Sequence, residues 1–256
     1  MWLLFKAATY VFIGELMIDK DLLPVHVAVI MDGNGRWAQK NKVNRVQGHN
    51  AGMLSMKEII KRADVLGIKY LTVYAFSTEN WKRSEEEVGG IFGLVVKYVA
   101  SELEELHKNN VKVKILGDYS KIPKSAFTSI NKALETTANN TGLQFNIALN
   151  YGARQEIIRA TKKVANLVAA GELKEDDITE EIIAKYLYTG EENGNVPDPD
   201  LIIRTSGEER ISNFLLWQAA YSEFAFTDSL WPDFTPDEFE TIIEEYTKRN
   251  RRFGGR

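Results

Sequence analysis

Several short polar segments of the sequence carry the residue types that bind phosphate groups and a divalent cation. In residues 32–37, Asp32 is followed by Gly33 and Gly35, spaced by one residue, and then by Arg36. Such glycines let backbone N–H groups turn toward one anion, and an arginine can pair with two phosphate oxygens. A carboxylate at this position suits Mg²⁺, which prefers oxygen ligands. A plain strand-to-helix turn would have the same residues, and the segment alone favours that reading.

Residues 204–212 form a second candidate anion site. Arg204, Arg210 and Ser212 surround a glycine and could clamp a second diphosphate. Glu208 and Glu209 could instead pair with these arginines in a solvated loop. The segment leaves both alternatives open.

Two further ionisable residues fit the same chemistry. Glu223 lies in an apolar and aromatic stretch, where a carboxylate is costly unless it meets a cation. Mg²⁺ or an arginine would satisfy it equally well. His49 follows the first glycine segment closely and could donate to a phosphate oxygen, whereas His26 and His107 are predicted to be structural. Three scattered histidines without cysteine argue against zinc.

The elements that position these segments alternate between strands and helices. Short apolar runs with β-branched residues predict buried strands at 25–31, 70–76, 111–116, 145–149 and 201–203. Helical patterns cover 51–66, 85–108, 124–138, 154–169, 178–187 and 236–249. This alternation predicts an α/β domain with a mostly parallel sheet flanked by helices. Polar residues follow four of the strands, so they are expected at the carboxyl-end edge where such sheets bind ligands.

Local signals define several helix ends and loops. Ser84 and Glu87 form a capping-box pattern at the start of the helix at 85–108. Asp176 and Asp177 resemble an acidic metal motif, but their place before a helix predicts a cap. Residues 190–199, rich in Gly, Asn, Asp and Pro, predict an exposed loop.

Composition limits the possible functions. The 256 residues, 44% of them hydrophobic, suit one large domain with a sizeable core. No cysteine is present, which excludes disulfides and thiolate chemistry and fits a cytosolic enzyme. The net charge of −4 argues against a nucleic-acid binder. Residues 1–17 are too short and too interrupted by charge for a membrane span, and we expect a helix packed on the domain.

Taken together, longer motifs in the chain resemble the cis-prenyltransferase family, most closely the bacterial undecaprenyl diphosphate synthases. The matching segments are residues 26–38, 48–49, 74–81 with Arg83, 149–152, 200–207, 210–218 and 251–255. The resemblance implies a six-stranded, mostly parallel α/β sheet with a hydrophobic tunnel, in a single catalytic domain at 25–256 after an N-terminal extension or helix at 1–24. It also implies a cytoplasmic homodimer with transient membrane contact for product release.

The activity implied by the resemblance is Mg²⁺-dependent chain elongation. Isopentenyl diphosphate would be added repeatedly to an allylic diphosphate such as farnesyl diphosphate. The product would be a long polyprenyl diphosphate such as undecaprenyl diphosphate, a lipid-carrier precursor for cell-wall synthesis. The helix at 85–108 is the expected tunnel wall, although its apolar stripe also suits ordinary core packing.

The resemblance also assigns roles to individual residues. Asp32 would hold Mg²⁺ with Glu223, and Asn80 would accept or organise the transferred proton. The allylic diphosphate would bind to Gly33, Asn34, Gly35, Arg36, Arg45 and His49. Isopentenyl diphosphate would bind to Arg204, Arg210 and Ser212, reached across the dimer by residues 252–254. Further substrate contacts would come from Trp37, Ser77, Thr78, Glu79, Trp81, Arg83 and Ile211.

Two other functions fit the same motifs. The chain could be a non-catalytic partner subunit of a prenyltransferase, or a regulatory protein that binds phosphate without turnover. The presence of Asp32, Arg204 and Arg210 favours the enzyme.

Overall fold

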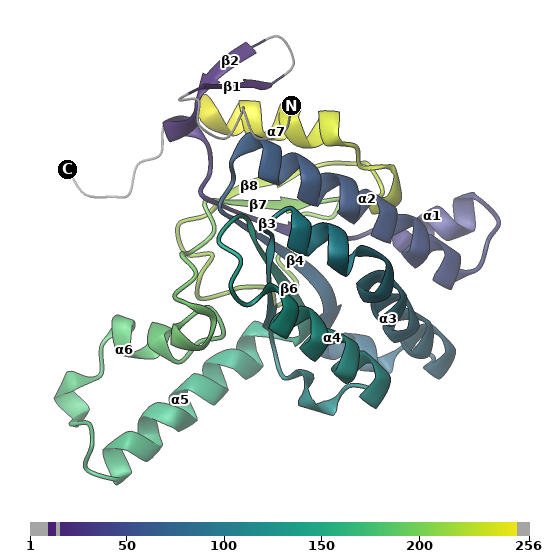
Figure 1. Ribbon diagram of the computed structural model, residues 1–256. Helices are drawn as coiled ribbons and strands as arrows, with labels where there is room; N and C mark the ends of the chain where they lie inside the picture. The colour runs from purple at the N-terminus through teal and green to yellow at the C-terminus, as the bar shows by residue number, and fades with distance from the viewer. Residues whose placement is uncertain (1–9, 14–15, 250–256) are drawn as a thin grey trace.

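A fully parallel sheet of six strands forms the centre of the structure, a computed structural model that describes residues 10–13 and 16–249 (Figure 1). The strand order is β5-β6-β4-β3-β7-β8. The strands are β3 (His26–Ile30), β4 (Tyr70–Ser77), β5 (Lys112–Leu116), β6 (Gln144–Tyr151), β7 (Leu201–Arg204) and β8 (Glu223–Phe226). The predicted fold class is confirmed, and only β8 had not been recognised as a separate strand.

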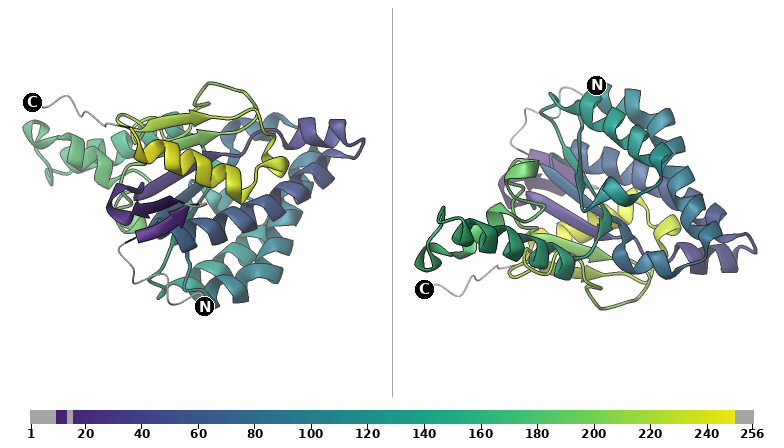
Figure 2. Two further views of the ribbon diagram at one scale, coloured as in Figure 1. Left: turned by 90° about the horizontal axis from the view of Figure 1, so that it is seen from above. Right: turned by 90° about the horizontal axis from the view of Figure 1, so that it is seen from below.

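Long helices cover one face of the sheet, and a segment with Phe214 and Leu215 packs on the other. The long helices α2 (Arg45–Leu66), α3 (Glu85–Lys108) and α4 (Lys124–Thr137) lie side by side on one face, with α7 (Pro236–Thr247) beside α2. In contrast, α5 (Ala153–Ala169) and α6 (Glu180–Lys185) form an arm that extends away from the body (Figures 1 and 2). None of the described helices has both the length and the apolar character needed to cross a bilayer.

The continuous apolar strands are explained by burial on both faces. In β3, Val27 and Val29 pack against α2 and α7, whereas Ala28 and Ile30 face a second core cluster with Phe214. Successive side chains of a strand point to opposite faces, so a strand between two helical layers needs an apolar residue at every position.

The helix expected near the N-terminus is wrong for the residues that the structure describes there. β1 (Tyr10–Ile13) and β2 (Leu16–Asp19) form an antiparallel hairpin that α7 contacts (Figure 2). Val11 and Ile13 are buried in the main core, while Phe12 between them is exposed. This alternation with period two is the pattern of a strand rather than of a helix.

Two local predictions also need correction. The N-cap of α6 is Thr179, whose hydroxyl accepts from the backbone of Ile182, and not the acidic pair before it. The segment at 190–199 is only partly exposed, since Asn193 is buried and its amide donates to the carbonyl of Ile115 at 3.0 Å. That contact covers the free edge of β5 and protects it from pairing with another chain.

The buried His26 should make stability depend on pH. Its ring contacts the Pro197 carbonyl at 2.6 Å and the Thr72 hydroxyl at 2.7 Å, and burial lowers its pKa to about 4. The unfolded chain takes up this proton near pH 6.5 and the folded chain only near pH 4. The free energy of unfolding should therefore fall by about 3 kcal/mol as the pH drops through this window.

Urea unfolding of His26→Gln between pH 7.5 and 4.5 tests this dependence. In His26→Gln, the free energy of unfolding should no longer show the fall with decreasing pH that His26 causes. His107→Gln, at an exposed position, should keep the pH dependence of the wild type. Equal slopes in the wild type and His26→Gln would contradict the assignment.

Candidate active site

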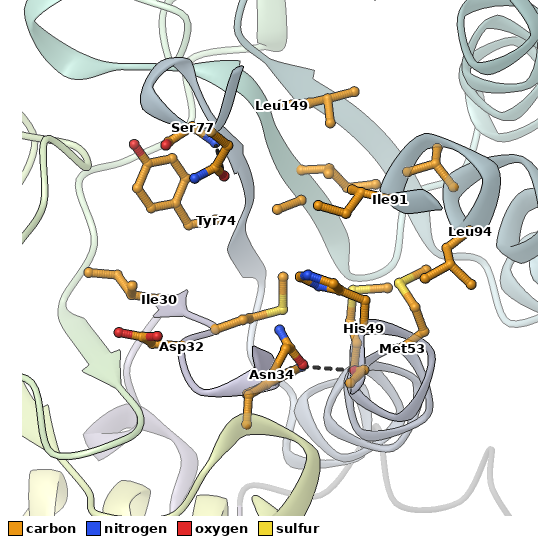
Figure 3. A pocket seen from close by; sticks show the side chains of 18 of the residues that line it. Ile30, Asp32, Asn34, His49, Met53, Tyr74, Ser77, Ile91, Leu94 and Leu149 are labelled. Carbon is orange, nitrogen blue, oxygen red and sulfur yellow. Dashed lines mark hydrogen bonds between the residues drawn. The ribbon is translucent and has the colours of Figure 1, made fainter. Parts of the chain in front are cut away.

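The loops that follow β3, β4 and β7 converge on a cavity of about 830 Å³. Its mouth is polar and its interior is apolar. Figure 3 shows Asp32 on one side of the cavity and Ile91 and Leu94 of α3 on the other. The cavity therefore combines a site for a charged group with space for a hydrocarbon.

Asp32 lies at the carboxyl end of β3 and is the central acid of the mouth. Its Oδ2 accepts from Arg204 at 2.9 Å, and its Oδ1 accepts from the backbone of Gly33 at 2.7 Å and lies 3.5 Å from Arg36. Burial raises the pKa of Asp32, but the hydrogen bond and charge of Arg204, with smaller contributions from Gly33 and Arg36, bring it below its ordinary value. The carboxylate is therefore ionised at neutral pH.

The glycine segment is the start of a short helix, α1 (Asn34–Lys40), and not only a loop. Gly33 precedes it with a φ of 107°, and a Cβ there would lie 3.0 Å from Leu230. Glycine is needed for both reasons. From α1, Arg36 reaches the loop after β7, where it donates to the carbonyl of Ser206 at 2.9 Å and to its hydroxyl.

Arg204 ties the two strand ends together. Its side chain is only 5% exposed. One terminal nitrogen donates to Asp32, and the other donates to the hydroxyl of Ser212 at 2.6 Å and to the carbonyl of Arg210. All these acceptors belong to the protein, so Arg204 fixes the shape of the mouth.

A second acid, Glu87, gathers three basic side chains on the opposite side. Its carboxylate, 8% exposed, lies 2.8 Å from Arg83, 3.2 Å from Arg45 and 3.4 Å from His49. Burial raises the pKa of Glu87, but Arg83, His49 and Arg45 outweigh it and lower the pKa overall. Burial also lowers the pKa of His49, so its ring is neutral near pH 7.

Glu87 is the main site residue that sequence reasoning missed. Only half of the predicted capping box forms: the Ser84 hydroxyl accepts from the Glu87 backbone at 3.3 Å, but the Glu87 carboxylate turns to the cavity. Glu87 follows Arg83 by four residues in the sequence, a spacing at which opposite charges can pair. This spacing was the sequence signal that could have indicated the contact. Tyr74, Arg154 and Asn213 also line the cavity without having been assigned a role.

Asn80 lines the cavity from the turn after β4. Its Oδ1 accepts from the backbone N–H of Ser77 at 3.0 Å. Among the described residues, no acceptor pairs with its Nδ2. The amide is thus fixed at its oxygen end and can offer its NH₂ group to a ligand.

Most of the predicted site residues share this one cavity. The lining includes Asp32, Gly33, Asn34, Gly35, Arg36, Arg45, His49, Ser77, Glu79, Asn80, Arg83, Arg204 and Ser212.

The other predicted substrate contacts do not line the cavity. The indole of Trp37 donates to Asp233 at 2.7 Å, and that of Trp81 donates to Asn150 at 2.8 Å. Arg210 pairs with Glu208, the hydroxyl of Thr78 donates to Glu79 at 3.2 Å, and Ile211 packs on the core. The structure therefore does not bring these five residues into the cavity with the others. Residues 252–254 lie outside the described part of the chain.

Within one chain, the structure does not bring Glu223 together with Asp32, with which it was predicted to share a metal. Glu223 begins β8 and pairs in register with Leu201, whereas Arg204, beside Asp32, pairs with Phe226. Three residues of strand separate the two ends by about 10 Å. The Glu223 carboxylate instead accepts from Arg249 at 3.0 Å, which is the alternative of an arginine partner.

Helix α3 supplies much of the apolar wall, as predicted. Ile91, Leu94, Val95, Val99 and Leu103 line the cavity from this helix. Strands β5 and β6 and helix α4 close the far side with Val113, Ile147, Ile130 and Ala133.

Part of the apolar stripe of α3 serves the core instead. Val88 and Phe92 pack in a cluster with Phe76. Ile91 and Val95 line the cavity and also pack with this cluster, so the stripe contributes to both.

Comparisons with known proteins agree with this geometry. A family model described as putative undecaprenyl diphosphate synthase matches residues 30–254. An isoprenyl transferase of Clostridium perfringens (strain 13 / Type A) is 51% identical over 241 residues, 94% of each chain. One from Clostridium tetani (strain Massachusetts / E88) is 48% identical over 258 residues, the full length of both.

Solved structures show the same fold. The lavandulyl diphosphate synthase from Lavandula x intermedia, in complex with dimethylallyl diphosphate, superposes with a TM-score of 0.89 at 37% identity, covering 92% of this chain and 100% of its own. A probable undecaprenyl diphosphate synthase from Campylobacter jejuni gives a TM-score of 0.73 at 35% identity, with coverages of 91% and 99%.

Proposed function

Since the chain belongs to the undecaprenyl diphosphate synthase family and is a prenyltransferase, we propose that it elongates an allylic diphosphate with isopentenyl diphosphate. Farnesyl diphosphate is the proposed starter. The proposed product is a long-chain polyprenyl diphosphate such as undecaprenyl diphosphate, the precursor of the lipid carrier for cell-wall synthesis. One observation carries this proposal: a single cavity joins an arginine-rich mouth to an apolar interior.

Two groups of basic and polar side chains at the mouth suit two diphosphates. Arg45, His49 and Arg83 form one group around Glu87, on the side of α2 and α3. Arg204 and Ser212 form the other, on the side of β7. We assign the allylic diphosphate to the first group, next to the apolar interior, and isopentenyl diphosphate to the second. Asp32 accepts a hydrogen bond from Arg204 and lies beside Arg36, where the loops after β3 and β7 meet.

The residues at the mouth fit a Mg²⁺ ion. Asp32 is an ionised carboxylate, and Mg²⁺ usually takes one or two carboxylates together with phosphate oxygens and water. The oxygens of a bound diphosphate and water would complete the coordination of such an ion. When bound, the ion would stabilise negative charge on the departing diphosphate.

The protein groups would promote the reaction mainly through charge and position. Arg36, Arg45 and Arg83 are arranged to stabilise the diphosphate that leaves the allylic carbon. The double bond of isopentenyl diphosphate then attacks that carbon, and the new unit loses a proton. An amide is a poor base, so Asn80 would orient a group that takes the proton, such as a diphosphate oxygen, through its free NH₂.

The assay for the proposed function contains farnesyl diphosphate, isopentenyl diphosphate and Mg²⁺, followed by product sizing. The proposal predicts polyprenyl diphosphates several units longer than the starter. A complete lack of product would favour a non-catalytic subunit or a phosphate-binding regulator instead.

Product release should limit steady-state turnover. Each added five-carbon unit that enters the apolar cavity contributes about 3–4 kcal/mol, at about 0.8 kcal/mol per methylene. A long product is therefore held tightly, and we propose that it leaves by transient contact of a cytoplasmic enzyme with a membrane. Detergent should raise the steady-state rate several-fold and leave the first turnover unchanged. Equal steady-state rates with and without detergent, at equal product length, would contradict the proposal that product release limits turnover.

We also propose that the chain forms a homodimer through the edge that β8 presents. Tyr221, Phe224 and Phe226 are 69%, 37% and 43% exposed, and the last two rings stack at 6.1 Å. Exposed aromatic clusters on an edge strand are typical of protein interfaces. Sedimentation equilibrium should give twice the chain mass, and Phe226→Asp should shift it toward the monomer. A wild-type monomer at micromolar concentration would refute the dimer.

A further inference from the structure

The arginines at the cavity mouth differ in whether they are already paired with an acid. Arg36 and Arg204 pair with Asp32, and Arg45 and Arg83 pair with Glu87. Arg154 also lines the cavity, but in the described part of the chain no carboxylate lies within ion-pair distance of it. It is exposed, so its guanidinium is free to meet an incoming anion.

The fold places Arg154 beside the group of Arg204 and Ser212. It is the second residue of α5, and its backbone N–H donates to the side chain of Asn213 at 2.9 Å. The N–H of Ala153 donates to the Asn213 carbonyl, also at 2.9 Å. Asn213 directly follows Ser212 in the chain, and both have a positive φ, of 51° for Ser212 and 62° for Asn213. This turn joins the start of α5 to the Arg204 hydrogen bond.

Among the residues that the structure describes, the other arginines on this side of the mouth are already hydrogen-bonded to protein groups. Arg204 uses both terminal nitrogens on protein acceptors, and its Nε is buried without a partner. Arg210 pairs with Glu208 and does not line the cavity. An arginine without an acidic partner can meet a diphosphate directly, whereas a paired arginine must first give up hydrogen bonds to the protein.

We propose that Arg154 binds the diphosphate of the isopentenyl substrate and determines affinity for that substrate rather than for the allylic one. The inference rests on the proposed function. A planar guanidinium can pair with two phosphate oxygens, which an ammonium cannot do in the same way. The group of Arg45, His49 and Arg83 is on the other side of the mouth, so the allylic diphosphate should not depend on Arg154.

Steady-state kinetics of Arg154→Gln and Arg154→Lys test the proposal. We expect Arg154→Gln to raise the KM for isopentenyl diphosphate about tenfold, the effect of losing one charge-assisted contact, and to change the KM for farnesyl diphosphate less than twofold. Arg154→Lys should fall between Arg154→Gln and the wild type. Lys162→Gln, an exposed position on the same helix, serves as the matched charge control and should behave as the wild type.

Several results would overturn the proposal: an unchanged KM for isopentenyl diphosphate in Arg154→Gln, an equal rise in both KM values, or the same change in Lys162→Gln. Calorimetric titration with isopentenyl diphosphate, in the presence of farnesyl thiodiphosphate and Mg²⁺, separates this inference from the proposed function. If the wild type makes no product but binds isopentenyl diphosphate more tightly than Arg154→Gln does, the assignment of Arg154 stands and only the catalytic proposal fails.

Discussion

Replacement of Asp32 by asparagine should lower turnover on the order of 1000-fold or more, while the protein remains folded. The side chain keeps nearly the same shape but loses the charge that would hold Mg²⁺ and that pairs with Arg204 and Arg36. Removal of a single group that stabilises transition-state charge commonly costs 100- to 1000-fold, and loss of a metal ligand adds to this. Single-turnover rates with farnesyl diphosphate measure the chemical step directly.

Two controls make the Asp32 result interpretable. Arg204 keeps its contacts with Ser212 and the Arg210 carbonyl, so the thermal unfolding midpoint should change by only a few degrees. Asp237→Asn, an exposed acid in the first turn of α7, should retain full activity. Retention of more than a tenth of the single-turnover rate in Asp32→Asn, with unchanged Mg²⁺ dependence, would show that Asp32 is not the central acid.

Replacement of Val99 by tryptophan should shorten the product by several isoprene units. Val99 lies on the cavity face of α3, eight residues beyond Ile91, or about 12 Å along the helix at 1.5 Å per residue. An indole at this depth would block the path of the growing chain but leave the diphosphate groups untouched. The first condensations should keep their rate. Thin-layer or mass-spectrometric sizing should show that the maximum product length is shorter than in the wild type.

The neighbouring residue Ala100 provides the control for this change. It is exposed on α3 and does not line the cavity, so Ala100→Trp adds the same ring outside the path. The wild type and Ala100→Trp should give the same products. An unchanged product distribution for Val99→Trp would mean that the chain does not grow along α3.

The residues that could be predicted from the sequence are those governed by local rules. Asp32 and Arg204 each stand directly after a buried apolar run, and strand ends of a parallel sheet share one edge. The sequence therefore predicts that they meet, and a hydrogen bond of 2.9 Å joins them. Helical periodicity likewise predicted the apolar stripe of α3, and the resemblance predicted that this stripe lines a tunnel.

The residues that escaped prediction depend on tertiary contacts. Glu87 pairs with Arg45 and His49 across 42 and 38 residues of sequence, and its local pattern showed only a helix cap. That Glu223 lies far from Asp32 within one chain could not be predicted, because it depends on the direction of β8 in the sheet. Trp37 and Trp81 belong to matching motifs, but a motif does not reveal toward which side a ring turns.

A crystal structure with farnesyl thiodiphosphate, isopentenyl diphosphate and Mg²⁺ bound together tests the central claim most directly. It should show both diphosphates at the mouth of one cavity, with the ion on the carboxylate of Asp32 and the farnesyl chain along Ile91, Leu94 and Val95 of α3. An Asp32 carboxylate that contacts neither the ion nor a diphosphate, or a farnesyl chain outside this cavity, would contradict the account.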